Sequence, residues 1–225
     1  MPYSRELLAG DSQDVARALI GGRLVRDGVS GVRVGRIVEV EAYIGADDLA
    51  SHARFGRTKR TAVMFGPPGY AYVYLVYGMY HCLNVVTEPE GRPAALLVRA
   101  VEPLEGVDLM RRAREGWVAT RRARQGADRV ARARQRVAAL PVAELASGPG
   151  LVCAAFSIER ADDGVDLCDP ASPLRLESPP DGEPRLPVAS GPRVGVGYAP
   201  EPWRSRPWRF WASGNASVSA RAGRQ

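Results

Sequence analysis

Residues 70–87 read YAYVYLVYGMYHCLNVVT, a run rich in tyrosine and valine, which are residue types that favour β-strands. Gly78 and Met79 interrupt the run, and a glycine at the first turn position suits a two-residue hairpin turn. The stretch therefore predicts two antiparallel strands joined at Gly78-Met79. Such a hairpin would hold Tyr77 and Tyr80 beside its tip, where a ring has little core to pack into.

The remainder of the chain predicts a mixed fold. Strand patterns occur at residues 23–26, 32–43, 94–101, 193–198 and 208–218. Helical patterns occur at 12–20, 104–115, 118–140 and 151–158. Loop composition fills 44–68, and residues 162–187 are predicted to be loop with short strands. Strands, then helices, then strands predict a single α+β domain over residues 1–225, built around an antiparallel sheet.

Composition describes an ordinary globular chain. It has 225 residues, 45% hydrophobic and 25% charged, and no stretch approaches the ~20 apolar residues of a membrane helix. The start, MPYSRELLAGDSQ, lacks the profile of a signal peptide. The cysteines at 82, 153 and 168 form no CxxC pair, and neither histidine has metal-site spacing to them. We expect a cytoplasmic, monomeric protein without a membrane partner, a disulfide framework, a metal or a cofactor.

Positive charge is concentrated in one segment. The chain carries a net charge of +6, and residues 111–136 hold ten arginines against Glu115 and Asp128, a net +8. Guanidinium groups offer forked donors for phosphate oxygens, which points to a nucleic-acid backbone. A solvated helix face explains the same run, so both interpretations remain open here.

Two carboxylates lie in the strand pattern RIVEVEAYIG at 36–45. Glu39 and Glu41 fall on one face of this strand, and apolar residues fall on the other. A carboxylate at the end of a hydrophobic strand is an unusual place for a surface charge. An exposed face with an ion pair to Arg33 or Arg36 is the plainer interpretation, and alternation alone does not decide.

The aromatic residues also admit two interpretations. A rigid ring on a hairpin tip, as predicted for Tyr77, can wedge between base pairs and fill the gap left by an extruded nucleotide. For Tyr72 and Tyr80 we favour a structural role, in which the ring stabilises the strand and the hydroxyl end faces solvent. A lone histidine such as His52, in the loop SHAR at 51–54, is more often a structural hydrogen-bonding residue than a catalyst.

Several of these stretches together resemble one known family. In order, RIVEVEAYIG, SHAR, MFGPPGYAYVYLVYGMYHCLNVV, LLVRAVEPLEG and SGPG resemble the methylpurine (alkyladenine, 3-methyladenine) DNA glycosylases over roughly residues 10–220. The resemblance implies a curved antiparallel sheet, flanking helices and a protruding hairpin that enters the minor groove. It also implies base excision repair, in which a damaged purine is flipped out of double-stranded DNA and its N-glycosidic bond is hydrolysed.

The resemblance assigns roles to individual residues. Glu41 matches the general base that activates the attacking water, and Arg99 matches the arginine that helps to hold that water. Tyr77 matches the tyrosine inserted into the duplex, with Met79 and Tyr80 touching the DNA beside it. The remaining matches line the pocket of the flipped purine: Tyr43 on one side, His52 and Tyr74 on the other, Asn84 opposing the 2-amino group of guanine, and Leu97 contributing to its width.

Other positions refine the expected reaction. Lys59 is the chain's only lysine, and a glycosylase that also cleaves the strand needs an amine for its Schiff base, so simple hydrolysis is predicted. Many relatives carry a lysine after the SGP turn, where this chain has Gly150-Leu151; a phosphate contact there would fall to backbone N–H groups. Ala216 replaces a frequent proline, which predicts a looser pocket edge.

Two functions follow from these residues. The first is a monofunctional glycosylase for purines of the 3-methyladenine, 7-methylguanine, hypoxanthine and ethenoadenine class, among which the sequence does not choose. The second is a non-catalytic protein that binds damaged DNA through the minor groove. The arginine run and Tyr77 suit both, whereas Glu41 with Arg99 favours the enzyme.

Overall fold

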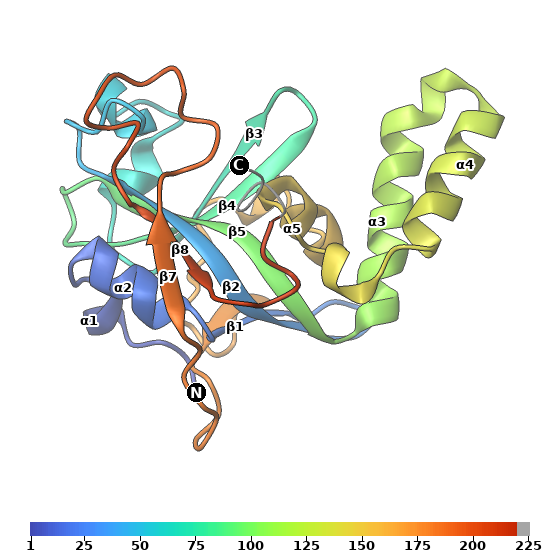
Figure 1. The fold of residues 1–225 in the computed structure, drawn as a ribbon, viewed down its shortest axis with the longest axis horizontal. Coiled ribbons are helices and arrows are strands. Elements are labelled where there is room, and N and C mark those ends of the chain that lie inside the picture. The colour runs from blue at the N-terminus through green and yellow to red at the C-terminus, as the bar shows by residue number, and fades with distance from the viewer. Residues whose placement is uncertain (220–225) are drawn as a thin grey trace.

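The computed structural model describes residues 1–219, and eight antiparallel strands form one sheet across it (Figure 1). The strands are β1 (Arg23–Arg26), β2 (Arg33–Ile44), β3 (Ala71–Val76), β4 (Tyr80–Val86), β5 (Ala94–Glu105), β6 (Leu174–Glu177), β7 (Val188–Gly191) and β8 (Arg209–Ala212). The main path runs β3-β4-β5-β2-β1-β6, while β8 pairs with β2 and β7 pairs with β8. The mixed α+β fold around an antiparallel sheet is confirmed; the last six residues of the predicted domain, 220–225, lie outside the described residues.

Helices cover the sheet and extend beyond it. They are α1 (Arg5–Leu8), α2 (Ser12–Leu19), α3 (Val107–Arg122), α4 (Ala127–Ala138) and α5 (Pro149–Phe156). Short 3₁₀ turns are η1 (His52–Phe55), η2 (Ala62–Phe65), η3 (Ala123–Gln125), η4 (Val142–Glu144) and η5 (Arg160–Asp162). Helix α2 packs on β2, α5 packs on β4 and β5, and α3 joins α5 to the outer helix α4. In residues 1–219 no helix has the length and apolar character to cross a membrane.

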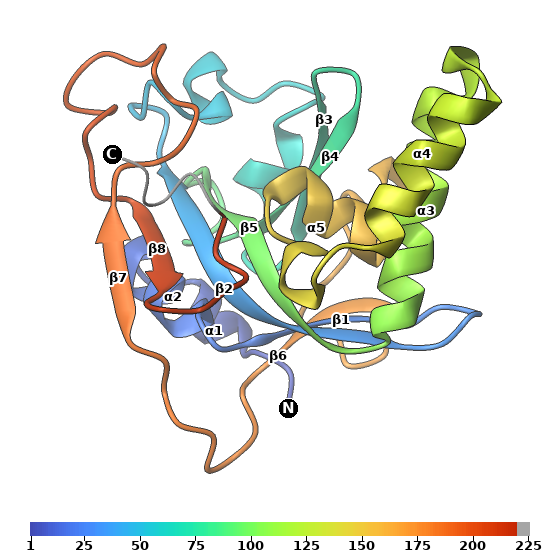
Figure 2. The ribbon, with the colours of Figure 1, turned by 45° about the vertical axis from the view of Figure 1, so that its right-hand side comes forward.

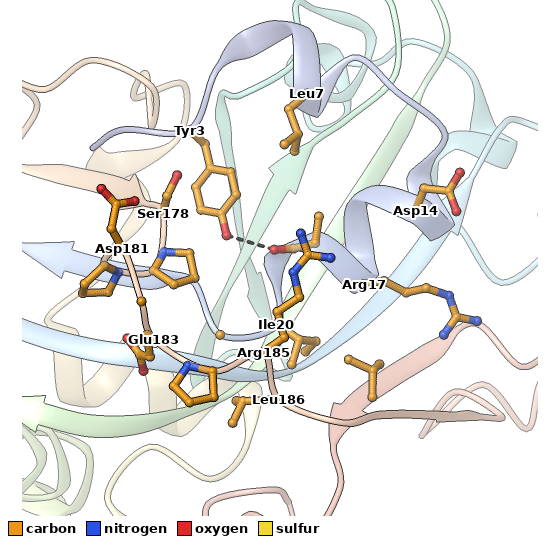
Figure 3. A pocket seen from close by; sticks show the side chains of 17 residues that line it. Tyr3, Leu7, Asp14, Arg17, Ile20, Ser178, Asp181, Glu183, Arg185 and Leu186 are labelled. Atoms are coloured by element: carbon orange, nitrogen blue, oxygen red, sulfur yellow. Dashed lines mark hydrogen bonds between the residues drawn. The ribbon is translucent and has the colours of Figure 1, made fainter.

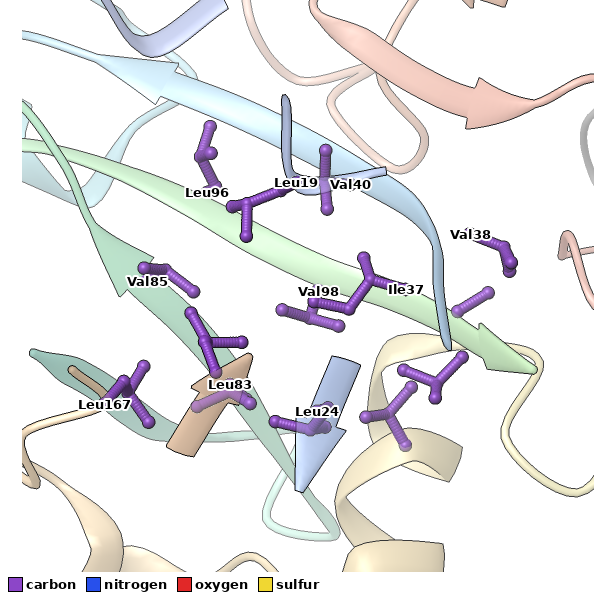
Figure 4. Packing of buried hydrophobic residues seen from close by; sticks show 14 of the residues in the cluster. Leu19, Leu24, Ile37, Val38, Val40, Leu83, Val85, Leu96, Val98 and Leu167 are labelled. Carbon is purple, nitrogen blue, oxygen red and sulfur yellow. The ribbon is translucent and has the colours of Figure 1, made fainter. Parts of the chain in front are cut away.

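One continuous core lies between the sheet and its helices. Leu83 of β4, Leu96 and Val98 of β5, and Val40 of β2 point into it together with Leu19 of α2 (Figure 4). All five are fully buried, and each such side chain contributes about 1.5–3 kcal/mol relative to exposure. The core fixes which face of β2 and β5 is apolar, so the opposite face is free to carry other groups.

Strands β2 and β5 pair with two irregularities at the middle of the sheet. The residue partners skip Val38 on β2 and Arg99 on β5. An additional residue of this kind is a β-bulge, which bends the strand and re-aims side chains. Arg99 lies at this bulge, two residues after Leu97 on the non-core face of β5, and it contacts both glutamates of β2.

Several local predictions were wrong. The strand predicted over 208–218 ends at Ala212, and residues 104 and 105, predicted to be helical, extend β5. The helical break expected near residues 116–117 falls instead at residues 123–126, since α3 continues through Gly116 and the chain turns at Gly126, whose φ is 92°. The hairpin turn has three residues, Tyr77 to Met79, because Val76 pairs with Tyr80.

A further error concerns residues 193–198, which form a loop rather than a strand. Arg193 spends its hydrogen bonds on the carbonyl of Ala42 and the carboxylate of Asp48, and Gly195 takes a φ of 81°. The alternating pattern of residues 193–198 therefore reflects contacts with buried groups such as Asp48, and not pairing with a neighbouring strand.

Gly35 tests the packing of β2 against α5. A Cβ at this position would lie 2.3 Å from Val101 Cγ1 and 3.0 Å from Phe156 Cζ. We expect Gly35→Ala to lower the free energy of unfolding by about 1–3 kcal/mol, because overpacking a tight core strains it. Urea denaturation measures the change. Gly116→Ala is the matched control: its Cβ would meet nothing within 4 Å, so stability should hold or rise, and an equal loss in both variants would refute this account.

Candidate active site

Both glutamates of β2 are buried, so the plainer interpretation of an exposed strand face is wrong. Glu39 and Glu41 are each 0% exposed. Arg36, offered as their surface partner, instead pairs with Glu102 and Glu183, and Arg33 donates to the carbonyl of Phe156. Burying a carboxylate is costly unless it is paired and hydrogen-bonded, so the partners of each one matter.

Glu39 is held on all sides. It accepts hydrogen bonds from Arg99 Nε at 2.9 Å, from Arg209 Nε at 2.6 Å, and from both the backbone N–H and the hydroxyl of Ser219. A carboxylate offers about four acceptor positions. Glu39 therefore has a structural role, anchoring β5, β8 and the segment after β8.

Glu41 has fewer partners. It accepts the Val194 N–H at 2.6 Å and the Tyr43 hydroxyl at 2.9 Å, and its Oε1 lies 3.3 Å from Arg99 Nη1. Burial raises the pKa of Glu41 above its ordinary value, although the Arg99 charge and the two hydrogen bonds oppose that shift. Of the two acids, Glu41 retains acceptor capacity for a water molecule, as a general base requires.

A small cavity of about 60 Å³ is lined by Tyr43, whose hydroxyl donates to Glu41, and aromatic rings dominate its walls. Its lining residues are Tyr43, Ala50, Ser51, His52, Met64, Tyr72, Tyr74, Asn84, Ala95 and Tyr198. The His52 and Tyr74 rings meet edge to face, 4.6 Å apart at 75°. Tyr72 is 1% exposed and its hydroxyl lies 3.0 Å from His52 Nδ1, so the expectation that its hydroxyl end faces solvent was wrong.

His52 presents a neutral ring to the cavity. Desolvation lowers its pKa from 6.5 to about 4, with further lowering from the nearby charges of Arg60 and Arg54. At neutral pH the imidazole is therefore uncharged. This suits a stacking surface better than a proton donor.

Tyr43 is held at its hydroxyl and over its ring. Its hydroxyl donates to Glu41, and the Arg193 guanidinium lies 4.7 Å from its ring centroid. Arg193 in turn forms a buried ion pair with Asp48, at 2.5 and 2.9 Å. The pocket wall is thus tied directly to the buried acid.

The other pocket candidates lie on β4 and β5. Asn84 is buried, and its amide nitrogen donates to the Tyr72 carbonyl at 2.9 Å, which holds its side chain at the cavity. Leu97 lies between Glu41 and Asn84 in the sheet register. It does not line the cavity; Ala95, two residues earlier on the same strand face, does.

The hairpin tip carries an exposed ring on a strained turn. Tyr77 is 84% exposed with φ 51°, and Gly78 follows with φ 64°. Met79 beside it is 47% exposed. The hairpin therefore presents an aromatic ring to solvent on a turn whose backbone conformation costs free energy.

Helix α3 braces this tip. Tyr80 stacks on Trp117 with ring centroids 4.8 Å apart, and Arg121 Nη1 donates to the Gly78 carbonyl at 2.7 Å. A Cβ on Gly150 of α5 would lie 2.3 Å from the Tyr80 ring, so glycine is needed there. Tyr80 thus packs against the helices, while Tyr77 stays free.

A larger cavity, of about 770 Å³, lies away from this site, between α2 and residues 178–188 (Figure 3). Its walls are largely apolar, with Leu7, Ile20 and Leu186 among them. Glu183, an acid in its lining, is already paired with Arg23 and Arg36. The residues that line the smaller aromatic cavity therefore make it the better candidate for the functional site, although the other cavity is larger.

Sequence reasoning missed several residues of the site. Val194 and Arg193 were assigned to a strand, and Tyr198, whose hydroxyl donates to the Ala50 carbonyl, was not singled out. The glycines of RVGVG at 193–197 were the available signal, because two glycines in five residues argue against a regular strand.

The two histidines allow a direct test of the cavity's electrostatics. We expect the His52 imidazole to titrate near pH 4 and to stay neutral at pH 7, because it is desolvated beside cationic side chains. Arg60→Gln should raise that pKa by removing one such charge. Two-dimensional NMR of the imidazole resonances follows the titration, and His81→Gln assigns the signals. Protonation of His52 between pH 6 and 7 would contradict this description.

Comparison with known proteins agrees with this geometry. The family model for methylpurine-DNA glycosylase matches residues 6–216. A protein of Anaeromyxobacter dehalogenans strain 2CP-C, named as a candidate 3-methyladenine DNA glycosylase, is 45% identical over 97% of this chain and 87% of its own length. Similarly named proteins of Methanocella arvoryzae and Bacillus cytotoxicus are 46% and 41% identical, each over 93% of this chain, and over 91% and 95% of their own lengths. These matches favour an enzyme over a non-catalytic binder, and the chain belongs to the methylpurine-DNA glycosylase family of DNA N-glycosylases.

Proposed function

We propose that this protein removes alkylated purines such as 3-methyladenine from double-stranded DNA, the first step of base excision repair, by simple hydrolysis. The observation that carries the proposal is the fully buried Glu41 carboxylate, paired with Arg99 and bonded to Tyr43, which lines an aromatic cavity. A protein that only binds DNA gains nothing from burying this charge, whereas a general base with a raised pKa needs such surroundings.

Glu41 acts on a water molecule. The N-glycosidic bond breaks through a sugar cation, and water attacks the anomeric carbon while a carboxylate takes its proton. The negative charge also stabilises the developing positive charge of the sugar. Arg99 lies between Glu39 and Glu41 and keeps the Glu41 carboxylate oriented, which makes it a positioning residue.

The pocket residues recognise the flipped base. Tyr43 stacks on one face of the purine, and His52 with Tyr74 forms the opposite wall. Stacking contributes about 1–3 kcal/mol per base, and aromatic faces attract the positive charge of an alkylated purine. A cationic purine leaves as a neutral base, so it needs no proton from His52, whose lowered pKa leaves it uncharged. Asn84, held at the cavity by Tyr72, opposes the 2-amino group of normal guanine.

Tyr77 opens the duplex. We assign its exposed ring to the gap left by the flipped nucleotide, with Met79 and Tyr80 next to the neighbouring base pairs. The turn that presents the ring is held by Arg121, which favours an insertion with little rearrangement. Lys59, the only lysine, is exposed in the loop between η1 and η2 rather than buried with Glu41 and Arg99, which supports hydrolysis without strand cleavage.

Glu41→Gln tests the assignment of the base. The amide keeps the shape of the side chain but accepts no proton, so we expect single-turnover excision to fall by about 10²–10⁴-fold while DNA binding persists. Release of 7-methylguanine from a duplex gives the rate. Excision at the wild-type rate would remove Glu41 from the reaction.

The pH profile follows from the same residue. A general base must be ionised, so excision by the wild type should fall as the pH drops through the raised pKa of Glu41, above the ordinary range for glutamate.

Glu39→Gln is the matched comparison for Glu41→Gln. It leaves Arg99 and Arg209 short of a buried partner, so it should lower the melting temperature, which Glu41→Gln should affect less.

Tyr77→Ala tests whether the Tyr77 ring acts as a wedge, that is, whether it fills the gap left by the flipped nucleotide. Losing one stacked ring should weaken base flipping by about 1–3 kcal/mol, seen as a reduced fluorescence change of 2-aminopurine placed beside the lesion. Tyr77→Phe keeps the ring and should keep the signal. If alanine flips the base as well as the wild type does, the hairpin has another role.

A further inference from the structure

The arginines of α3 and α4 divide into two groups with different partners. Arg111 donates to the carbonyls of Val137, Ala138 and Leu140 at the end of α4, each at 2.9 Å, and buried Arg114 donates to the Leu145 carbonyl. Arg111 therefore ties α3 to the end of α4, and Arg114 ties α3 to the chain after η4. Their charge is used within the protein.

The second group is exposed and lines a groove between the two helices, which the buried Arg114 also lines. Arg129, Arg132 and Arg136 share one face of α4, being three and four residues apart, and Arg122 faces them from α3. The groove has a volume of about 450 Å³. Among the described residues, the ion pair within α3 and α4 joins Arg134 to Glu115. None of the four groove arginines has a described carboxylate oxygen within 4.0 Å.

Four like charges around one groove repel each other, and that repulsion disfavours the arrangement unless an anion offsets it. Guanidinium forks match phosphate oxygens, and a row of them spaced along a helix suits a chain of phosphates better than a single small anion. All four side chains are exposed, so an extended partner can reach them.

The groove lies on the α3–α4 pair, which projects from the protein next to the hairpin that carries Tyr77. Helices α3 and α4 extend from the body of the protein in the same direction as the β3–β4 hairpin in both ribbon views (Figures 1 and 2). The two projections touch, since Arg121 near the end of α3 donates to the Gly78 carbonyl at the hairpin tip. A duplex entered by Tyr77 therefore passes close to the α3–α4 pair.

We propose that the groove arginines Arg122, Arg129, Arg132 and Arg136 bind the phosphate backbone of the same duplex, flanking the lesion. This proposal rests on the proposed function, because the wedge places the DNA. It makes the α3–α4 pair a second DNA contact, which adds affinity without sequence preference and takes no part in the chemistry. A merely solvated helix face would leave DNA binding unaffected by these charges.

The salt dependence of binding measures phosphate contacts directly, since each one releases counterions and adds about 0.9 to the slope of log K against log salt. The probe is a duplex with a tetrahydrofuran abasic analogue, which offers no base to release. We expect Arg129→Gln/Arg132→Gln to reduce the magnitude of the slope by about 2. Glutamine preserves helix propensity at both exposed sites. Single-turnover excision at saturating enzyme should match that of the wild type.

Arg17→Gln/Arg185→Gln is the matched control, removing two exposed arginines at the cavity between α2 and residues 178–188. Its slope should equal that of the wild type. An unchanged slope in the α4 variant, or an equal drop in the control, overturns the proposal while excision by the wild type still supports the proposed function. If the wild type neither binds the analogue nor excises an alkylated purine, both proposals fail.

Discussion

Two carboxylates buried side by side impose the main constraint on this structure. Glu39 and Glu41 project from one face of β2 into the protein, where a charge without partners would be strongly destabilising. Arg99, at a bulge in the β2–β5 pairing, contacts both acids. The end of the chain supplies the remaining partners: Val194, Arg209 and Ser219 all donate to this pair. The last strands and loops thus close over the site to satisfy its charge.

The two acids share an arginine yet differ in what they can do. Glu39 accepts four hydrogen bonds and Glu41 accepts two, so one acid anchors the surrounding segments and the other, the proposed base, keeps acceptor capacity. The network has a functional consequence, because the Tyr43 hydroxyl on Glu41 couples the pocket wall to the proposed base. A change in the acid would therefore be felt at the stacking surface.

A single hairpin links base recognition to the proposed opening of the duplex. Tyr72 and Tyr74 line the cavity from β3, and the chain reaches the exposed Tyr77 three residues later. Because β3 and β4 pair along their length, the distance from pocket to wedge is set by a rigid element rather than by a flexible loop. Helix α3 extends this control, since it braces the tip through Trp117 and Arg121.

The sequence by itself determined the elements and the type of chemistry. Alternation placed the strands, the run at 70–87 predicted the hairpin, and the motifs around Glu41 and Arg99 identified the family. Only the tertiary structure decided that Glu39 and Glu41 are buried, which of them retains acceptor capacity, and that residues 193–198 form a loop around them. It also separated the arginines that cap carbonyls from those that line a groove. The physical reason is separation along the chain: Val194 bonds to Glu41 from 153 residues away and Ser219 to Glu39 from 180, and no local pattern encodes such contacts.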